Sequence, residues 1–407
     1  MFPSTPCSSQ TMLSSQTGQS QDGSMVRSQD AIDRPRAELR ALTGLRFLAA
    51  AHVVLFHFYK PPMVESAASL RPLIASGPAS VSLFFVLSGF ILTFTYADEL
   101  SSGQFNARAF FSARFARVYP VYLFCLLLAL AGSFRRTAHP SWLNIGLNLL
   151  LLQTWIPLAL PAINLPSWSL SVEAAFYLFF PMLARFALRI PSRALPLCAF
   201  SIWIASLATP AIYDAWSLHG AATPISTEFV QASPLVRLPE FVIGVLLGHH
   251  FLATVRIEGA QPRVSYAWLA ALALLLSWYF FGQHPTSMLE SSLLAPLYGW
   301  LIYQLARGGG LLGRLLSTSF MKRLGEASYA LYLIHYVFYF RFAALCKMLG
   351  ILTGDPNGFF CAYLLASIAA SLLIYRFIEE PARMAIKRWF RPRQVLLAPV
   401  RGGSSNS

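Results

Sequence analysis

The stretch LTGLRFLAAAHVVLFHFY, residues 42–59, decides the fold because it has nearly the length of a membrane span and yet carries ionisable side chains. A spanning helix needs about 20 mainly apolar residues. Within one, Arg46 and His57 are costly, since an ionisable group in hydrocarbon costs roughly 2.5–3.5 kcal/mol on insertion scales. At 1.5 Å per residue they lie about 16 Å apart along a helix, half of a bilayer. We interpret Arg46 and His57 as two separate contact points along one path through the membrane, and not as one ion pair.

The composition is that of a polytopic membrane protein whose partner is a lipid bilayer. The chain of 407 residues is 56% hydrophobic and 12% charged, whereas a soluble domain carries about 25% charged residues. Residues 1–40 are rich in Ser and Gln without an apolar run, which predicts a disordered polar tail and no removable signal peptide. The net charge of +14 does not indicate nucleic acid, because Lys and Arg cluster at the ends of apolar segments. The scattered cysteines predict neither a disulfide framework nor a metal site.

About eleven apolar segments of near-spanning length follow the tail. They cover residues 42–59, 77–96, 117–134, 143–160, 168–188, 195–212, 235–253, 266–282, 287–306, 327–346 and 358–378. Short loops rich in Lys and Arg are expected on the cytoplasmic side. Such loops lie at 97–116, 185–194 and 307–326, and both chain ends are also basic.

One segment must then fail to span, because three segments separate two loops that belong on the same side. We expect this to be 143–160, which Asn144, Asn148, Gln153 and Pro157 interrupt. Irregular backbone at membrane depth is tolerated only where it lines a cavity, so 143–167 is expected to border the active space. The predicted fold is an all-α transmembrane bundle in residues 41–385, with about ten spanning helices plus one re-entrant or cavity-lining segment. Residues 386–407 form a basic tail, and both termini are expected in the cytoplasm.

The stretch NLPSWSLSVE, residues 164–173, places a carboxylate at the start of a strongly apolar segment. Local structure explains part of it, because Pro166 suits a helix start, Ser167 can act as an N-cap, and Glu173 is favourable near a helix N-terminus. A structural role therefore stays open for Glu173. In the predicted topology, however, Glu173 and His57 lie at similar depth, which favours a shared site.

Two further groups of polar residues lie in or beside apolar segments. Ser328, Tyr332 and His335 recur at helical spacing and form one stripe. Such a stripe more often holds helices together than performs catalysis, so His335 is either a substrate or cofactor contact or a packed core residue. Arg114 and Arg117 share a helix face at the cytoplasmic boundary, where they either anchor the topology or bind a phosphate-rich ligand through bidentate guanidinium contacts.

The stretch FFVLSGF, residues 84–90, places Ser88 and Gly89 in the middle of a span. Small residues at such a position predict close helix packing. A nucleophile elbow is not indicated, because it needs glycine two residues before the serine, where Val86 stands.

Together these stretches resemble the acyltransferase-3 family of integral membrane O-acyltransferases. The matching pieces cover about residues 40–390 and are, in order, Arg46 with His57; FFVLSGF; Arg114-Phe-Ala-Arg117 with Tyr119-Pro120; Trp168-Ser-Leu-Ser171-Val-Glu173; Arg237-Leu-Pro-Glu240-Phe241; Ser328-Tyr329 to His335; and Ile378-Glu379-Glu380-Pro381-Ala382-Arg383. Each piece alone is weak, but the ordered set is specific.

The resemblance implies transfer of an acyl group, commonly acetyl, from acyl-CoA to a hydroxyl of a sugar, polysaccharide, lipid-linked glycan or macrolide, without a metal. It implies catalytic roles for His57, Arg46 and Glu173, and acyl-CoA binding by Arg114 and Arg117. The remaining candidates are polar residues that contact substrate or support the structure: Trp168, Ser171, Ser88, Arg237, Ser328, Tyr332 and His335.

The expected mechanism holds CoA at the cytoplasmic face and brings its thioester towards His57. An imidazole with its ordinary pKa of about 6.5 can act as a general base on the acceptor hydroxyl at neutral pH. A covalent acyl-histidine stays open as the alternative. We expect Glu173 to orient the imidazole of His57, as the third member of such arrangements does.

A secondary transporter or flippase is the competing hypothesis, because intramembrane Arg, His and Glu also form proton relays. No internal repeat of the kind that transporters show is evident in the sequence. The expected location is the cytoplasmic (inner) membrane. The sequence does not decide the acceptor, which we expect the loops 60–76 and 213–234 to select. Asp214, Trp216, His219 and Glu228 in the second loop are able to contact a sugar, but exposed-loop residues of this sort are usually just solvated.

Overall fold

The computed structural model describes residues 40–58, 69–133, 140–156, 162–220, 223–258, 265–284, 286–351 and 354–389. These residues are mostly helical and contain no strand, which confirms the predicted all-α class. Eight stretches among them are long and apolar enough to cross a membrane: Arg40–Phe58, Ala79–Ser101, Ala107–Ser133, Leu165–Leu188, Leu195–Leu218, Ile225–Val255, Ser319–Leu349 and Pro356–Ile386. The protein is therefore a multi-pass membrane protein. Most of both predicted tails lies outside the described residues.

The number of long spans is smaller than the expected ten because two segments form shorter helices. Helix α11 (Ala267–Phe281) has 15 residues, fewer than the roughly 20 that a span needs. The prediction of one continuous span over 287–306 is wrong, since the chain forms α12 (Ser287–Glu290) and α13 (Ala295–Ala306) with a break between them. Side-chain donors from other helices satisfy the backbone oxygens that the break frees: Arg237 Nη1 at 2.8 Å from Glu290, Ser82 Oγ at 2.7 Å from Ser291 and Trp203 Nε1 at 3.1 Å from Ser292.

The described part of the segment 143–160, residues 143–156, does not form a spanning helix, as predicted. Helix α5 (Trp142–Leu149) begins where the side chain of Ser141 accepts a hydrogen bond from the backbone of Asn144, and it has only eight residues. Soon after it ends, Leu151 has a φ of +57°. The chain then reaches the short helix η3 (Leu165–Ser167) and α6 (Trp168–Leu188).

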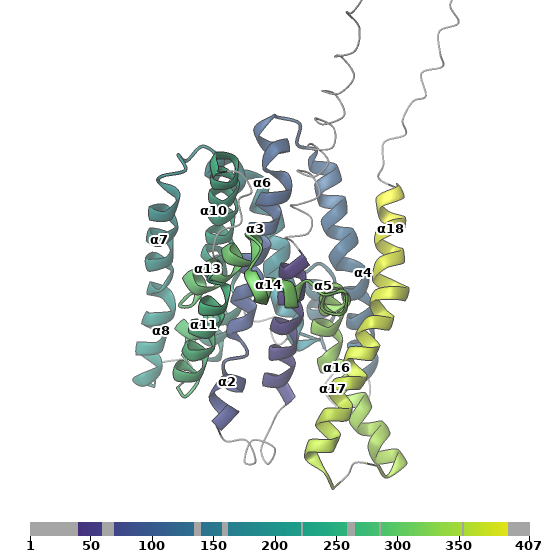
Figure 1. Cartoon of the computed structure of the whole chain (residues 1–407). Coiled ribbons are helices and arrows are strands. Elements are labelled where there is room, and N and C mark those ends of the chain that lie inside the picture. The colour runs from purple at the N-terminus through teal and green to yellow at the C-terminus, as the bar shows by residue number, and fades with distance from the viewer. Residues whose placement is uncertain are drawn as a thin grey trace, which may run out of the picture.

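Helices α3 (Ala79–Ser101) and α10 (Pro234–Glu258) pack closely beside α6 near the centre of the bundle (Figure 1). Gly89 and Gly244 permit this approach. A Cβ at Gly89 would lie 2.1 Å from the backbone oxygen of Phe241, and one at Gly244 would lie 2.0 Å from that of Val86. The predicted close packing at Ser88-Gly89 is confirmed.

A second group of helices completes the bundle. It comprises α4 (Ala107–Ser133), α15 (Ser319–Glu326), α16 (Ser328–Leu349), α17 (Pro356–Ile374), one π-helical turn η4 (Tyr375–Glu379) and α18 (Glu380–Trp389). The remaining short helices are α2 (Arg71–Ala75), α7 (Leu195–Ser206), α8 (Ala208–Leu218), α9 (Pro224–Ala232) and α14 (Gly310–Leu316).

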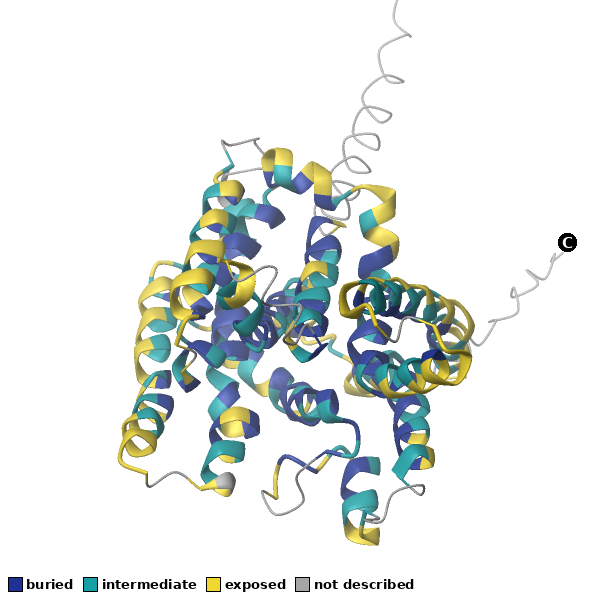
Figure 2. Ribbon diagram, turned by 90° about the horizontal axis from the view of Figure 1, so that it is seen from below, coloured by how far each residue is buried: buried dark blue, intermediate teal, exposed yellow. Residues whose placement is uncertain are grey.

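Figure 1 shows which helix ends lie at the same end of the bundle. The connection from α3 to α4 and the last turn of α18 lie at the upper end of Figure 1, whereas α2 and the end of α16 lie at the lower end. Figure 2 shows buried residues where helices face one another and exposed residues on the outer sides of the bundle. Large apolar side chains such as Leu127, Leu178 and Leu365 are among the exposed ones, as expected for a surface that faces lipid.

Candidate active site

Two cavities bring most of the predicted site residues together. The first, which we call the arginine cavity, has a volume of about 90 Å³, and its polar lining includes Arg46, Ser88, Arg114, Arg117 and Glu173. The second, which we call the histidine cavity, has a volume of about 350 Å³, and its polar lining includes His57, Trp168, Glu228, Arg237 and Glu290. Val81 and Tyr332 line both cavities, so the two spaces adjoin.

The arginine cavity collects positive charge from two helices. Arg46 comes from the first helix, and Arg114 and Arg117 come from one face of α4. The Arg114 guanidinium lies 5.8–5.9 Å from the ring centres of three aromatic side chains, those of Tyr96, Phe110 and Tyr177. The pairing of three guanidinium groups with fewer carboxylates suits an anionic ligand. The small volume of this cavity suits a narrow chain or a phosphate.

Two carboxylates balance part of this charge. Glu379, at the end of the π-helical turn, has a fully buried side chain with one oxygen 3.7 Å from Arg117 Nη1. Glu173 accepts hydrogen bonds from Ser88 Oγ at 3.0 Å and from the hydroxyl of Tyr177 at 2.5 Å. The expectation that Glu173 orients His57 is therefore wrong, because Glu173 lines the arginine cavity, and a different side chain lies against His57.

That side chain is His335. Its Nε2 lies 3.3 Å from Nδ1 of His57, and its own Nδ1 lies 3.2 Å from the backbone oxygen of Leu331. Nδ1 of His57 also lies 2.9 Å from the backbone oxygen of Val53. A carbonyl oxygen only accepts, so each Nδ1 carries the proton and donates it. His335 Nε2 is then an acceptor for the Nδ1–H of His57, and Nε2 of His57 holds the lone pair.

The other candidates of the α16 stripe have different neighbours. The Tyr332 hydroxyl is 2.8 Å from Ser169 Oγ at the boundary between the two cavities. Ser328 Oγ donates to the backbone oxygen of Gly325 at 2.7 Å, which is a helix-end contact beside the arginine cavity. His335 is 0% exposed and lines neither cavity. It is thus a packed core residue, one of the two roles that its sequence left open.

The predicted cavity-lining segment supports α6 and reaches the histidine cavity. Ser171 Oγ donates to the backbone oxygen of Leu151 at 2.6 Å and accepts from Thr154 Oγ1 at 2.7 Å. Ser171 itself lines neither cavity, so its role is structural. Ala162 and Leu165 do line the histidine cavity, as expected for residues 143–167.

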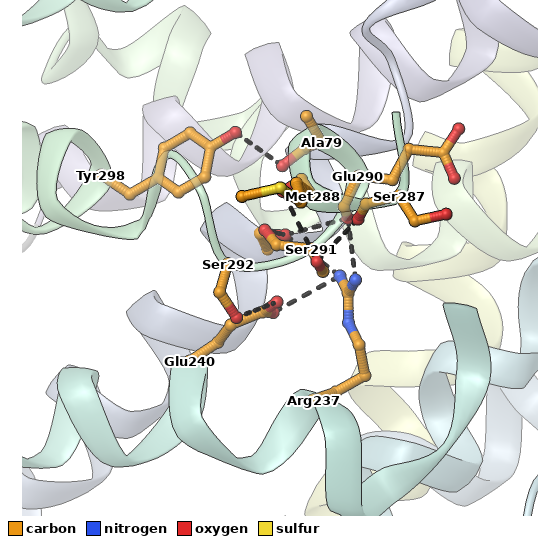
Figure 3. Close-up of polar contacts among 10 residues, drawn as sticks. Ala79, Arg237, Glu240, Ser287, Met288, Glu290, Ser291, Ser292 and Tyr298 are labelled. Carbon is orange, nitrogen blue, oxygen red and sulfur yellow. Dashed lines mark hydrogen bonds and ion pairs between the residues drawn. The ribbon is translucent and has the colours of Figure 1, made fainter. Parts of the chain in front are cut away.

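Arg237 connects α10 to the break between α12 and α13 (Figure 3). Its side chain is 1% exposed. Nη1 donates to the backbone oxygen of Glu290 at 2.8 Å, Nη2 donates to Ser82 Oγ at 3.0 Å, and Nη2 lies 3.4 Å from a carboxylate oxygen of Glu240. The guanidinium carbon is 5.8 Å from the ring centre of Trp168. This cluster fixes one wall of the histidine cavity.

The sequence interpretation missed Glu290 and Glu379 as residues of the site. Glu290 lies near the start of the segment 287–306, which reads as one span, and Glu379 lies in a motif at a helix end, so neither position carries a local signal. Within the described ranges no group of His, Cys, Asp and Glu side chains is placed to hold a metal ion.

The helices make this chain an integral membrane protein, and the two cavities give it a candidate site between the helices. It matches the acyltransferase domain family, the acyltransferase-3 family, over residues 39–376 and therefore belongs to it. Acyltransferase MdmB of Streptomyces mycarofaciens is 30% identical over 385 residues, 89% of this chain and 95% of that protein. A Staphylococcus aureus (strain COL) protein whose name assigns it as an O-acetyltransferase is 22% identical over 369 residues, 84% of this chain and 57% of its own length. No solved structure matches the chain significantly.

The protein is thus a membrane O-acyltransferase. Family membership decides between the two hypotheses drawn from the sequence in favour of the enzyme over the transporter.

Proposed function

We propose that the protein transfers an acyl group, most simply acetyl, from acyl-CoA to a hydroxyl of a carbohydrate, glycan or related acceptor such as a macrolide. The observation that carries the proposal is that a cationic cavity and a cavity containing a histidine adjoin at Tyr332. One suits the anionic donor, and the other suits a hydroxyl that must lose a proton. The relatives named acyltransferase and O-acetyltransferase support the same chemistry.

The donor binds through the three guanidinium groups of the arginine cavity. The cavity is too small for the nucleotide of CoA, so the nucleotide stays at the mouth, where Arg114 and Arg117 reach its phosphates in bidentate contacts. The narrow pantetheine arm passes Arg46 and carries the thioester towards Tyr332. Glu173, held by Ser88 and Tyr177, keeps part of the guanidinium charge compensated while the cavity is empty.

The acceptor hydroxyl loses its proton to Nε2 of His57 as its oxygen attacks the thioester carbonyl. The tetrahedral intermediate then collapses, the C–S bond breaks, and the imidazolium returns the proton to the CoA thiolate. His335 acts as a positioning residue, because its Nε2 accepts the Nδ1–H of His57 and so keeps the basic nitrogen unprotonated at rest. Positioned base catalysis of this kind typically contributes 10²–10⁴-fold to the rate.

The experiment compares His57→Ala with the wild type in proteoliposomes supplied with acetyl-CoA and acceptor. We expect a loss of turnover of roughly 10²–10⁴-fold, whereas His219→Ala, at an exposed position of the chain, leaves turnover unchanged. Near-normal turnover of the His57 variant would eliminate the proposed role.

We further propose that the protein resides in the cytoplasmic membrane with both termini in the cytoplasm. The basic loops at 97–116 and 185–194 support this orientation. Reporter fusions after residue 407 and in the loop near Gly350 test it, because the first must report the cytoplasm and the second the opposite side. The reverse pattern would refute the orientation without affecting the chemistry.

A further inference from the structure

The histidine cavity contains carboxylates that acyl transfer itself does not need. Glu228 on α9 and Glu290 at the end of α12 both line the cavity together with His57. Glu290 Oε2 accepts a hydrogen bond from Gln231 Nε2 at 3.0 Å. Within the part of the chain that the structure describes, the Glu228 carboxylate has no hydrogen-bond or ion-pair partner.

Arg237 neutralises these two carboxylates only in part. Its guanidinium pairs with the buried carboxylate of Glu240 and bonds the backbone oxygen of Glu290, while the carboxylate of Glu290 points away from it (Figure 3). Because Arg237 is paired with Glu240, Glu228 and Glu290 leave the cavity with an excess of negative charge. Burial raises the pKa of Glu290, and the charge of Arg237 and the hydrogen bond from Gln231 offset this effect only in part.

A buried donor in the same cavity also points to a ligand. Arg237 is 1% exposed and lines the histidine cavity, yet its Nε has no hydrogen-bond partner among the described residues. An unpaired buried N–H costs free energy until an acceptor oxygen reaches it. The cavity volume of about 350 Å³ falls within the range of roughly 300–1,000 Å³ that is typical of small-molecule sites.

We propose that the acceptor carries a protonated amine in addition to the hydroxyl that is acylated, as amino sugars do, and that Glu228 and Glu290 bind this amine. The inference rests on the proposed function, because it assigns the acceptor to the histidine cavity. The hydroxyl lies at His57, an oxygen of the acceptor faces Arg237, and the ammonium group lies between the two carboxylates. Phosphorylated and uronic-acid acceptors are excluded by the same charges, since like charges at close range in a partly buried site repel strongly.

The test measures binding at His57 without requiring turnover. Diethyl pyrocarbonate modifies the unprotonated imidazole, and mass spectrometry reports the modification of His57 relative to that of the exposed His284 in the same sample, which corrects for reagent consumed by amines. Three probes compete: the methyl glycosides of 6-amino-6-deoxyglucose, glucose and glucuronic acid, at pH 7. A charge-assisted contact contributes about 1.5–3 kcal/mol, so the amino glycoside is expected to protect at a roughly tenfold or more lower concentration than the neutral one.

The variants Glu228→Gln and Glu290→Gln preserve side-chain size and are each expected to reduce this preference severalfold. Glu99→Gln, at an exposed position on α3, changes the net charge equally and is expected to leave the preference intact. Equal protection by the amino and neutral glycosides, or no protection by the amino glycoside, overturns the inference, and the wild-type comparison alone suffices for this. Near-normal acyl transfer by the His57→Ala variant, with the amine preference of the wild type intact, would instead refute the proposed function.

Discussion

Replacement of His335 should slow the reaction by a moderate and calculable factor. In the proposed transition state His57 is an imidazolium whose Nδ1–H is shared between the backbone oxygen of Val53 at 2.9 Å and His335 Nε2 at 3.3 Å. A hydrogen bond from a charged donor contributes about 1.5–3 kcal/mol. Because the shorter of the two bonds remains, the lower figure applies, which corresponds to about tenfold in kcat. Removal of His57 itself costs much more, since the base is then absent.

The assay compares His335→Leu with His335→Gln in proteoliposomes. Leucine fills most of the space and cannot accept a hydrogen bond, whereas the amide oxygen of glutamine can accept the Nδ1–H of His57. We expect kcat to fall about tenfold for leucine and to recover partly for glutamine. The KM for acyl-CoA should stay constant in both, because the guanidinium groups line the other cavity. Thermal unfolding controls for folding. If His335→Leu is stable and retains full kcat, or if both variants lose activity equally, the positioning role is refuted.

Two further predictions concern stability. Glu379→Gln leaves Arg117 without its buried counter-charge. The loss of unfolding free energy should stay below the 3–5 kcal/mol typical of broken buried pairs, because Arg117 is 27% exposed. The Tm of this variant should therefore fall in the absence of ligand. CoA should raise the Tm of the variant more than that of the wild type, because a CoA phosphate replaces the lost negative charge. An equal increase in Tm for both proteins on CoA addition contradicts this prediction. Gly244→Ala should destabilise the protein by about 1–3 kcal/mol through overpacking, because the added Cβ meets the backbone of Val86. Gly132→Ala is the control, because a Cβ there meets only a side-chain atom at 3.8 Å. Thermal unfolding should show this control variant to be neutral or stabilised.

The sequence predicted those features that the bilayer imposes on every spanning chain. Length and apolarity identified the helices, and the polar residues within 143–160 identified the segment that does not span. The segment 287–306 was misjudged because it is apolar enough to span. Its break is stable because Arg237, Ser82 and Trp203 satisfy the freed carbonyl groups, and these partners lie 53 to 209 residues away along the chain. Such compensation from distant segments leaves no local signal.

The candidate residues were largely identified, but their grouping was not. The expected partners were His57 and Glu173, chosen because a one-dimensional topology placed them at similar depth. The structure instead pairs His57 with His335, which is 278 residues away, and Glu173 with Ser88, which is 85 residues away. Depth along the membrane normal does not determine which side chains are in contact, because side chains from several helices lie at every depth. The packing of the first helix against α16, and of α3 against α6, decides which of these polar groups meet.

The opposite charges of the two cavities suggest why the site is divided at Tyr332. In the proposed scheme, the guanidinium groups attract the anionic donor and repel an ammonium-bearing acceptor, while Glu228 and Glu290 do the reverse. Each proposed substrate would then be excluded from the cavity of the other, and the uncharged thioester would be the one part of the donor that must reach the boundary. The residues that line both cavities, Val81 and Tyr332, carry no charge that would oppose the thioester. Separation by charge thus selects both substrates, while the reaction itself requires no charged group to cross.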